Sequence, residues 1–202
     1  MSNNIDKIIY INLEKRPDRR DEMETELTNF SLSGERFNAI EFAEFGTVGC
    51  MKSHLSVLKL AKERNYKNVL ILEDDFTFTV SKEEFEEKLA KLFELDFDVC
   101  MLSHHQLNYN KTEYDFLLKV VSAQTASGYI VNQHYYDKLI QLFEWAAPLL
   151  EQTRAHWIYA NDQIWKSLQE TDNWYCFDKR LGKQRPGYNN TGETSKFVSY
   201  DC

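Results

Sequence analysis

The feature that most constrains this chain is an aliphatic run that ends abruptly on three carboxylates. Residues 69–72 read Val-Leu-Ile-Leu, and Glu73, Asp74 and Asp75 follow directly. A run without polar alternation predicts a strand buried on both faces, so the acids fall at its carboxyl end, where open α/β sheets bind their ligands. Three adjacent carboxylates repel one another, and a divalent cation that prefers oxygen ligands, Mg²⁺ or Mn²⁺, would relieve that repulsion. An acidic turn exposed to solvent, without a bound cation, would explain these three residues equally well.

Length and charge limit the classes of protein that this chain can belong to. Its 202 residues predict one domain spanning residues 1–202, with a core that needs no disulfide or metal to hold it. The net charge of -8 argues against a general binder of nucleic acid or of anionic membranes. The polar N-terminus lacks the apolar segment of a signal peptide, and no apolar stretch is long enough to cross a bilayer. We therefore expect a cytoplasmic protein without a transmembrane segment.

The cysteines give no sign of a metal or disulfide framework. Cys50, Cys100, Cys176 and Cys202 are far apart and form no Cys-x-x-Cys pair. Their spacing argues against zinc binding and for buried or idle thiols.

The order of the expected elements favours an α/β fold. Strands are expected at residues 7–12, 36–42, 69–72 and 97–102. Helices are expected from Pro17 through Leu27, after a loop at residues 46–49, and after a cap formed by Ser81 and Glu84. This alternation predicts a parallel sheet with helices on both faces. Beyond residue 105 we expect strands at 117–121 and 127–131, helices at 133–143 and 155–168, and a polar loop from Gly182 onward.

Basic residues follow the first expected strand. Arg16, Arg19 and Arg20 would lie at the same edge of the sheet as the acids if the two strands are parallel neighbours, placing anion-binding groups beside a metal. A solvated first helical turn explains any one of them at least as well. The helix that carries Ser53 and His54 would also present free N–H groups to a phosphate, although a lone histidine is more often a packed residue.

Asp162 lies near the start of an expected helix, among aromatic residues. An aspartate in that position is usually a helix cap. If its side chain instead faces the metal pocket, apolar surroundings would raise its pKa and suit it to take a proton from an incoming hydroxyl.

Several segments together resemble glycosyltransferase family 25, which includes bacterial lipooligosaccharide galactosyltransferases and collagen hydroxylysine galactosyltransferases. They cover nearly the whole chain: residues 10–20 (YINLEKRPDRR), 46–54 (GTVGCMKSH), 71–75 (ILEDD), 126–131 (ASGYIV), 162–163 (DQ) and 184–188 (QRPGY). The resemblance implies a GT-A type fold, a single mixed and mainly parallel sheet flanked by helices. It also implies a UDP-galactose or UDP-glucose donor and inversion at the anomeric carbon.

The resemblance also implies roles for individual residues. Asp75 would hold Mn²⁺ or Mg²⁺ against the diphosphate, Glu73 would bridge metal and ribose, and Asp162 would be the general base. Contacts to the nucleotide are expected from Asn12, Leu13, Arg16, Arg20, Ser53, His54 and Asp74. The tail departs from the family pattern, because residues 189–191 read Asn-Asn-Thr where relatives commonly carry Ser-Asp-Ile.

The expected function is therefore metal-dependent, inverting transfer of a hexose from a UDP-sugar to a hydroxyl of a glycan or of hydroxylysine. Two alternatives remain open at this point. A catalytically silent homologue would bind the nucleotide sugar without turnover. A metal-dependent phosphohydrolase would also use acids at a strand end, but the five histidines do not form the further ligand set that it normally needs.

Overall fold

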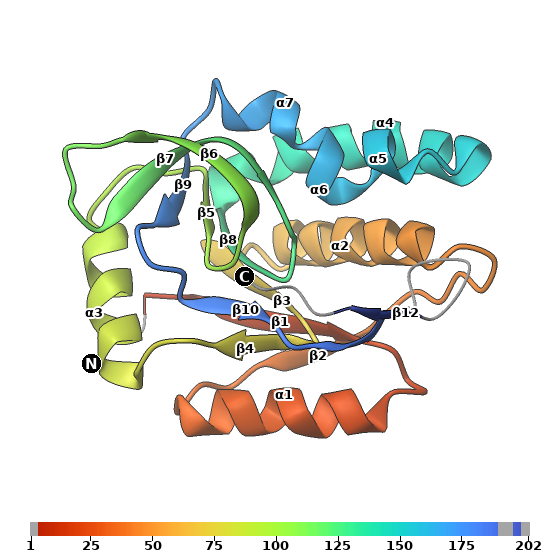
Figure 1. Ribbon diagram of the computed structural model, residues 1–202, viewed down its shortest axis with the longest axis horizontal. Helices are drawn as coiled ribbons and strands as arrows, with labels where there is room; N and C mark the ends of the chain where they lie inside the picture. The colour runs from red at the N-terminus through yellow and green to blue at the C-terminus, as the bar shows by residue number, and fades with distance from the viewer. Residues whose placement is uncertain (1–3, 190–195, 199–202) are drawn as a thin grey trace.

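The chain forms one large sheet with helices on both faces (Figure 1). The computed structural model describes residues 4–189 and 196–198. The strands are β1 (Lys7–Asn12), β2 (Glu35–Asn38), β3 (Asn68–Glu73), β4 (Phe76–Phe78), β5 (Val99–Met101), β6 (His105–Lys111), β7 (Leu117–Gln124), β8 (Gly128–Asn132), β9 (Trp174–Phe177), β10 (Gly182–Gln184), β11 (Gly187–Asn189) and β12 (Lys196–Val198). The helices are α1 (Pro17–Asn29), α2 (Gly46–Glu63), α3 (Lys82–Leu92), the 3₁₀ turn η1 (Gln133–Tyr135), α4 (Tyr136–Thr153), α5 (His156–Tyr159), α6 (Asn161–Ile164) and α7 (Lys166–Gln169).

The eight-stranded sheet has the order β2-β1-β3-β8-β5-β9-β7-β6. β1 pairs in parallel with β2 and β3, and β5 pairs in parallel with β9. β8 runs antiparallel between β3 and β5, and β7 runs antiparallel between β9 and β6. Of these described strands, only β7 and β8 therefore run against the common direction. The expected α/β architecture with a mixed, mainly parallel sheet is confirmed.

The sheet is buried on both faces because its central strands carry apolar residues at every position. Val69, Leu70, Ile71 and Leu72 of β3 are all completely buried. Alternate residues point to opposite sides: Val69 and Ile71 pack with α2 and α4, whereas Leu70 and Leu72 pack with α1 and α3. Figure 1 shows the same layers, with α2 and α4 above the sheet and α1 below it.

Most of the expected elements are confirmed. The strand at residues 7–12 and the helix start at Pro17 have the expected bounds. At the start of α3 the hydroxyl of Ser81 accepts a hydrogen bond from the Glu84 N–H at 3.2 Å, as the capping pattern predicted.

Four expectations need correction. The strand expected at 36–42 is shorter, because β2 covers only Glu35–Asn38. Residues 46–49 do not form a loop but the first turn of α2. The expected helix at 155–168 is three four-residue helices: the chain is extended at Ala160 (φ −59°, ψ 152°), between α5 and α6, and a turn at Trp165 separates α6 from α7. This break lets the side chain of Trp165 enter the core and donate to the Ala123 carbonyl at 3.2 Å, while Trp157 stays 65% exposed. The expected polar loop from Gly182 contains the short strands β10 and β11.

Two pairings build the edge where the acids lie. β1 and β3 are parallel neighbours, so the residues that follow them meet at one edge of the sheet. Asp74 and Asp75 form the turn between β3 and β4, and β4 pairs with β10. The ring of Phe76 packs directly on Gly182 of β10, where a Cβ atom would lie 2.0 Å from its Cζ atom, so this close approach requires glycine. The polar segment at Gln184 and Arg185 is thereby held beside the acids.

Among the helices that the structure describes, none is long and apolar enough to span a membrane.

Candidate active site

A cavity of about 560 Å³ opens at the carboxyl ends of β1 and β3. Its wall is formed by the turn after β1, the segment 39–43, the start of α2, the acidic turn, the end of β7, α5, α6 and β10. The residues that matter for the chemistry are Leu13, Arg16, Arg19, Cys50, Ser53, His54, Glu73, Asp74, Asp75, Thr125, His156, Asp162, Gln184 and Arg185. The structure thus brings the acidic motif together with the basic turn and with Asp162.

Asp75 has one buried carboxylate oxygen without a hydrogen-bond partner among the described residues. One oxygen, Oδ2, lies 3.5 Å from the guanidinium of Arg19. The other, Oδ1, is buried and has no hydrogen-bond partner within the described part of the chain. Burial, reinforced by the negative charge of Glu73 and opposed by Arg19, raises the pKa of Asp75 to about 7. A buried carboxylate oxygen without a partner is costly, and a divalent cation would satisfy it.

Asp74 ties the acidic turn to the strand beside it. Its carboxylate accepts from the side-chain amide of Asn12 at 2.8 Å and from Arg19 at 2.9 Å. The same Asn12 amide also donates to the carbonyl of Arg16, and its oxygen accepts from Arg36 at 3.0 Å. Burial raises the pKa of Asp74, and the charge of Arg19 opposes that shift. These contacts hold the turn in place.

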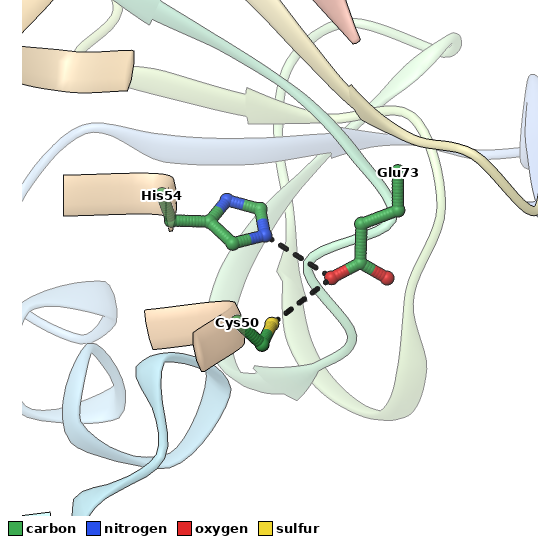
Figure 2. A group of neighbouring side chains, drawn as sticks. All are labelled: Cys50, His54 and Glu73. Atoms are coloured by element: carbon green, nitrogen blue, oxygen red, sulfur yellow. Dashed lines mark hydrogen bonds and ion pairs between the residues drawn. The ribbon is translucent and has the colours of Figure 1, made fainter. Parts of the chain in front are cut away.

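Glu73 is held by side chains from α2 and β10, and Figure 2 shows the two that come from α2. Its Oε1 atom lies 3.1 Å from His54 Nε2 and 3.4 Å from Cys50 Sγ, both on α2. Its Oε2 atom accepts from the amide of Gln184 at 3.3 Å. Burial acts to raise the pKa of Glu73, but the interactions with His54 and Cys50 outweigh it and keep that pKa below its usual value. Glu73 is therefore a fixed, ionised carboxylate at the base of the cavity.

Asp162 faces the cavity and does not cap a helix. The residue at the N-cap position of α6 is Ala160, and the Asp162 carboxylate instead accepts from the backbone N–H of Thr125 at 3.2 Å. Thr125 has a φ of 82°, a strained conformation for a β-branched residue. Burial raises the pKa of Asp162, the hydrogen bond from Thr125 opposes this, and the charge of Glu73 adds to it. A carboxylate of raised pKa in a cavity is suited to accept a proton.

The residues expected to contact the nucleotide fall into two groups. Leu13, Arg16, Ser53, His54 and Asp74 line the cavity. The Ser53 hydroxyl is already used, because it donates to the Gly49 carbonyl and accepts from the Ile40 N–H. Asn12 and Arg20 are not part of the described lining: Asn12 is buried behind it, and Arg20 pairs with Asp21 at 3.4 Å.

Sequence reasoning missed several residues of this site. Arg19 stood among the basic residues after β1 but was not assigned to the site, and Cys50 was expected to be idle. Tyr129, whose hydroxyl lies 2.9 Å from His54 Nδ1, gave no signal. Arg185 donates to the Asp74 carbonyl at 2.6 Å and lay in a segment noted only for its resemblance. Cys50 and His54 lie four residues apart and therefore on one face of α2. That spacing could have indicated that the two side chains belong to one site.

Of residues 189–191, which depart from the family pattern, the structure describes only the first. Asn189 ends β11, whereas Asn190 and Thr191 lie outside the described residues.

The fold and the cavity define an α/β protein with an acidic site at the carboxyl edge of its sheet. Residues 44–163, more than half of the chain, match the family described as Glycosyltransferase family 25 (LPS biosynthesis protein). The chain belongs to this family.

Curated relatives are similar over part of their length. The Glycosyltransferase 25 family member of Drosophila melanogaster is 29% identical over 101 residues, covering 37% of this chain and 16% of the relative. Procollagen galactosyltransferase 2 of Mus musculus is 26% identical over 142 residues (54% and 22%), and Inactive glycosyltransferase 25 family member 3 of Homo sapiens is 27% identical over 139 residues (52% and 23%). The matched part thus spans less than a quarter of each of these relatives.

Solved structures with a similar course of the chain include two glycosyltransferases. The apo form of GlyE from Streptococcus pneumoniae TIGR4 has a TM-score of 0.49 and 12% identity, covering 85% of this chain and 45% of that one. A glycosyltransferase involved in the glycosylation of the major capsid of PBCV-1 has a TM-score of 0.44 and 7% identity, covering 85% and 91%.

Proposed function

We propose that this protein is a metal-dependent, inverting glycosyltransferase that moves a hexose from a UDP-sugar to a hydroxyl acceptor. The observation that carries the proposal is the buried Oδ1 atom of Asp75, which lacks a partner within the described residues, in a cavity that also holds Asp162. Family membership supports the reaction class.

The residues present fit a hard divalent cation. Asp75 and Glu73 would hold Mn²⁺ or Mg²⁺ through carboxylate oxygens, the ligand type that these ions prefer. When bound, the cation would act as a Lewis acid toward the diphosphate of the donor. The positive charges of Arg16 and Arg19 line the same cavity and suit a diphosphate. Arg19 already forms ion pairs with Asp74 and Asp75. The guanidinium of Arg16 can therefore reorient more readily toward the donor.

Asp162 would take the proton from the acceptor hydroxyl as that oxygen attacks the anomeric carbon. A single displacement inverts the configuration at that carbon, and a general base for the acceptor hydroxyl supports it. Because the pKa of Asp162 is raised, it lies closer to the operating pH than the pKa of an exposed aspartate does.

The sugar and the acceptor are proposed at the level of class. Galactose or glucose is proposed for the donor, since a relative is named a procollagen galactosyltransferase. A glycan hydroxyl or a protein hydroxyl such as that of hydroxylysine is proposed for the acceptor. A second candidate is a silent homologue that binds the nucleotide sugar without transfer, because another relative is named inactive.

The proposal is tested by measuring UDP release over a panel of nucleotide sugars, with Mn²⁺ and with excess chelator. We expect release with UDP-galactose or UDP-glucose, dependence on the metal, and loss of release in Asp75→Ala. Asp137→Ala, on the exposed side of α4, serves as the matched control and should leave release unchanged. Full turnover in chelator, or an unaffected Asp75→Ala protein, would refute the proposal. Metal-dependent UDP binding without release from any donor would identify the silent homologue instead.

A further inference from the structure

Cys50, His54 and Glu73 form a cluster of three different ligand types. Cys50 and His54 lie four residues apart on α2, so their side chains leave the same face of the helix one turn apart. Glu73 ends β3 and meets them from the sheet. One ligand atom from each lies within 4.8 Å of the other two, and Figure 2 shows the side chains of Cys50 and His54 converging on the carboxylate.

The separations fit a small tetrahedral ion. Zinc binds thiolate sulfur at about 2.3 Å and imidazole nitrogen or carboxylate oxygen at about 2.0–2.2 Å, so neighbouring ligand atoms lie roughly 3.3–3.8 Å apart. The two separations from Glu73 Oε1, 3.1 Å to His54 Nε2 and 3.4 Å to Cys50 Sγ, need only small adjustments to reach that range. The set also matches zinc in softness, since a thiolate and an imidazole disfavour Mn²⁺ and Mg²⁺.

The surroundings supply the outer contacts that metal ligands usually have. The hydroxyl of Tyr129 lies 2.9 Å from His54 Nδ1, so its oxygen can accept a hydrogen bond from Nδ1–H when Nε2 faces a metal. Tyr129 is itself completely buried and packs edge-on against Trp165. Gln184 holds the other oxygen of Glu73. All three ligand residues line the cavity, which leaves an entry path and room for a water as fourth ligand.

We propose that Cys50, His54 and Glu73 form a binding site for zinc or a similarly thiophilic divalent cation, distinct from the hard-oxygen site at Asp75. On binding, the Cys50 thiol loses its proton to solvent, and the proton that His54 Nε2 donates to Glu73 leaves that nitrogen, so that Nδ1 carries the ring proton. The sulfur and Nε2 then exchange their hydrogen bonds to Glu73 for bonds to the metal. The spacing of the cysteines along the chain argued against zinc, because two of the three ligands are not cysteines.

The site shares Glu73 with the proposed donor site, and this consequence rests on the proposed function. A thiophilic cation at the cluster occupies the Oε1 atom of Glu73. We therefore expect Zn²⁺ to inhibit Mn²⁺-supported transfer, with inhibition weakened at least about 10-fold in Cys50→Ser.

Cobalt substitution tests the site directly, without any need for transferase activity. Adding Co²⁺ to the metal-free wild-type protein should give one equivalent of tetrahedral visible bands together with a sulfur-to-cobalt charge-transfer band. Zn²⁺ should remove these bands at a stoichiometric concentration, whereas Mn²⁺, which competes only for Glu73, should not do so at the same concentration. Cys50→Ser should lose the charge-transfer band, and Cys176→Ala, which alters a buried thiol in β9, should keep it.

A second measurement uses only the wild-type protein, so it does not depend on the folding of a variant. X-ray absorption of the zinc-loaded protein should show one sulfur neighbour at about 2.3 Å among nitrogen and oxygen neighbours. A zinc spectrum without sulfur, a cobalt spectrum of weak octahedral type only, or a charge-transfer band that survives in Cys50→Ser would overturn the proposal. Each of these results leaves the proposed transfer reaction standing, because that reaction is judged separately by UDP release with Mn²⁺.

Discussion

The guanidinium of Arg19 lies 2.9 Å from the carboxylate of Asp74, joining the first turn of α1 to the acidic turn after β3. The two residues are far apart in sequence and meet because β1 and β3 are parallel neighbours. Both side chains are largely buried, so the pair is screened little by solvent. Arg19 also faces Asp75, and its charge offsets the repulsion within the acidic motif.

Replacing Arg19 should therefore destabilise the metal-free protein. We expect Arg19→Met to lower the free energy of unfolding by about 1–3 kcal/mol, the range for losing a charge-assisted hydrogen bond. Arg20→Met is the matched control, because the neighbouring Arg20 pairs only loosely with Asp21 at the surface, and its loss should change stability by less than about 0.5 kcal/mol. Urea denaturation without added metal measures both. Equal effects of the two substitutions would contradict the role given to Arg19.

Asp162→Asn should separate catalysis from structure. An asparagine oxygen can still accept the hydrogen bond from Thr125 N–H, so stability and UDP affinity should stay nearly unchanged. Without a proton acceptor, transfer should fall by at least about 10²-fold. Initial rates, thermal unfolding and UDP titration of the same preparation provide the comparison. Near-normal transfer would remove Asp162 as the base.

Arg16→Ala should weaken binding of UDP in the presence of Mn²⁺ by about 1–3 kcal/mol, because Arg16 lines the cavity and its partner Asp18 lies at the surface. Arg64→Ala is the control, since Arg64 pairs with Glu35 at 2.7 Å elsewhere on the surface. Calorimetric titration gives both affinities. If the two variants bind UDP alike, the donor does not use Arg16.

Thr125→Gly should stabilise the protein, because glycine adopts a φ of 82° without the strain that threonine bears there. Glycine removes the strain but loses more conformational entropy on folding than threonine. The difference predicts that the free energy of unfolding rises by about 1 kcal/mol. Thr125→Ala retains the strain and should show no gain. Chemical denaturation of the three proteins tests this, and a glycine variant less stable than the alanine variant would be the contrary result.

His104 should make stability depend on pH. Burial, with the charge of Arg180, lowers its pKa from the ordinary 6.5 to about 4. Between these values the unfolded chain binds a proton that the folded protein does not, so the free energy of unfolding falls as the pH drops through this window. His104→Gln should flatten the decline. Urea denaturation at about pH 7 and about pH 5 measures the slope, and equal slopes in both proteins would show that other groups cause it.

The amino-acid sequence by itself determined the elements whose pattern is unambiguous over short range. The apolar run at 69–72 predicted a strand buried on both faces with acids at its end, and the structure has both. The sequence also predicted the strand at 7–12, the helix start at Pro17 and the Ser81 cap, because each depends on neighbouring residues only. The sequence placed Arg16, Arg19 and Arg20 near the acids only on the condition that the two strands are parallel neighbours, which the structure supplies.

Only the tertiary structure decided which of these side chains meet. Successive residues of a helix point about 100° apart, so the rotation of α1 against the sheet selects Arg19 for the acids and leaves Arg20 at the surface. The break at Ala160 accompanies the burial of Trp165 against β7, a contact between residues remote in sequence. The same holds for Glu73, whose partners Cys50, His54 and Gln184 come from α2 and β10. Local patterns fix backbone elements, whereas side-chain geometry at a site depends on how those elements pack.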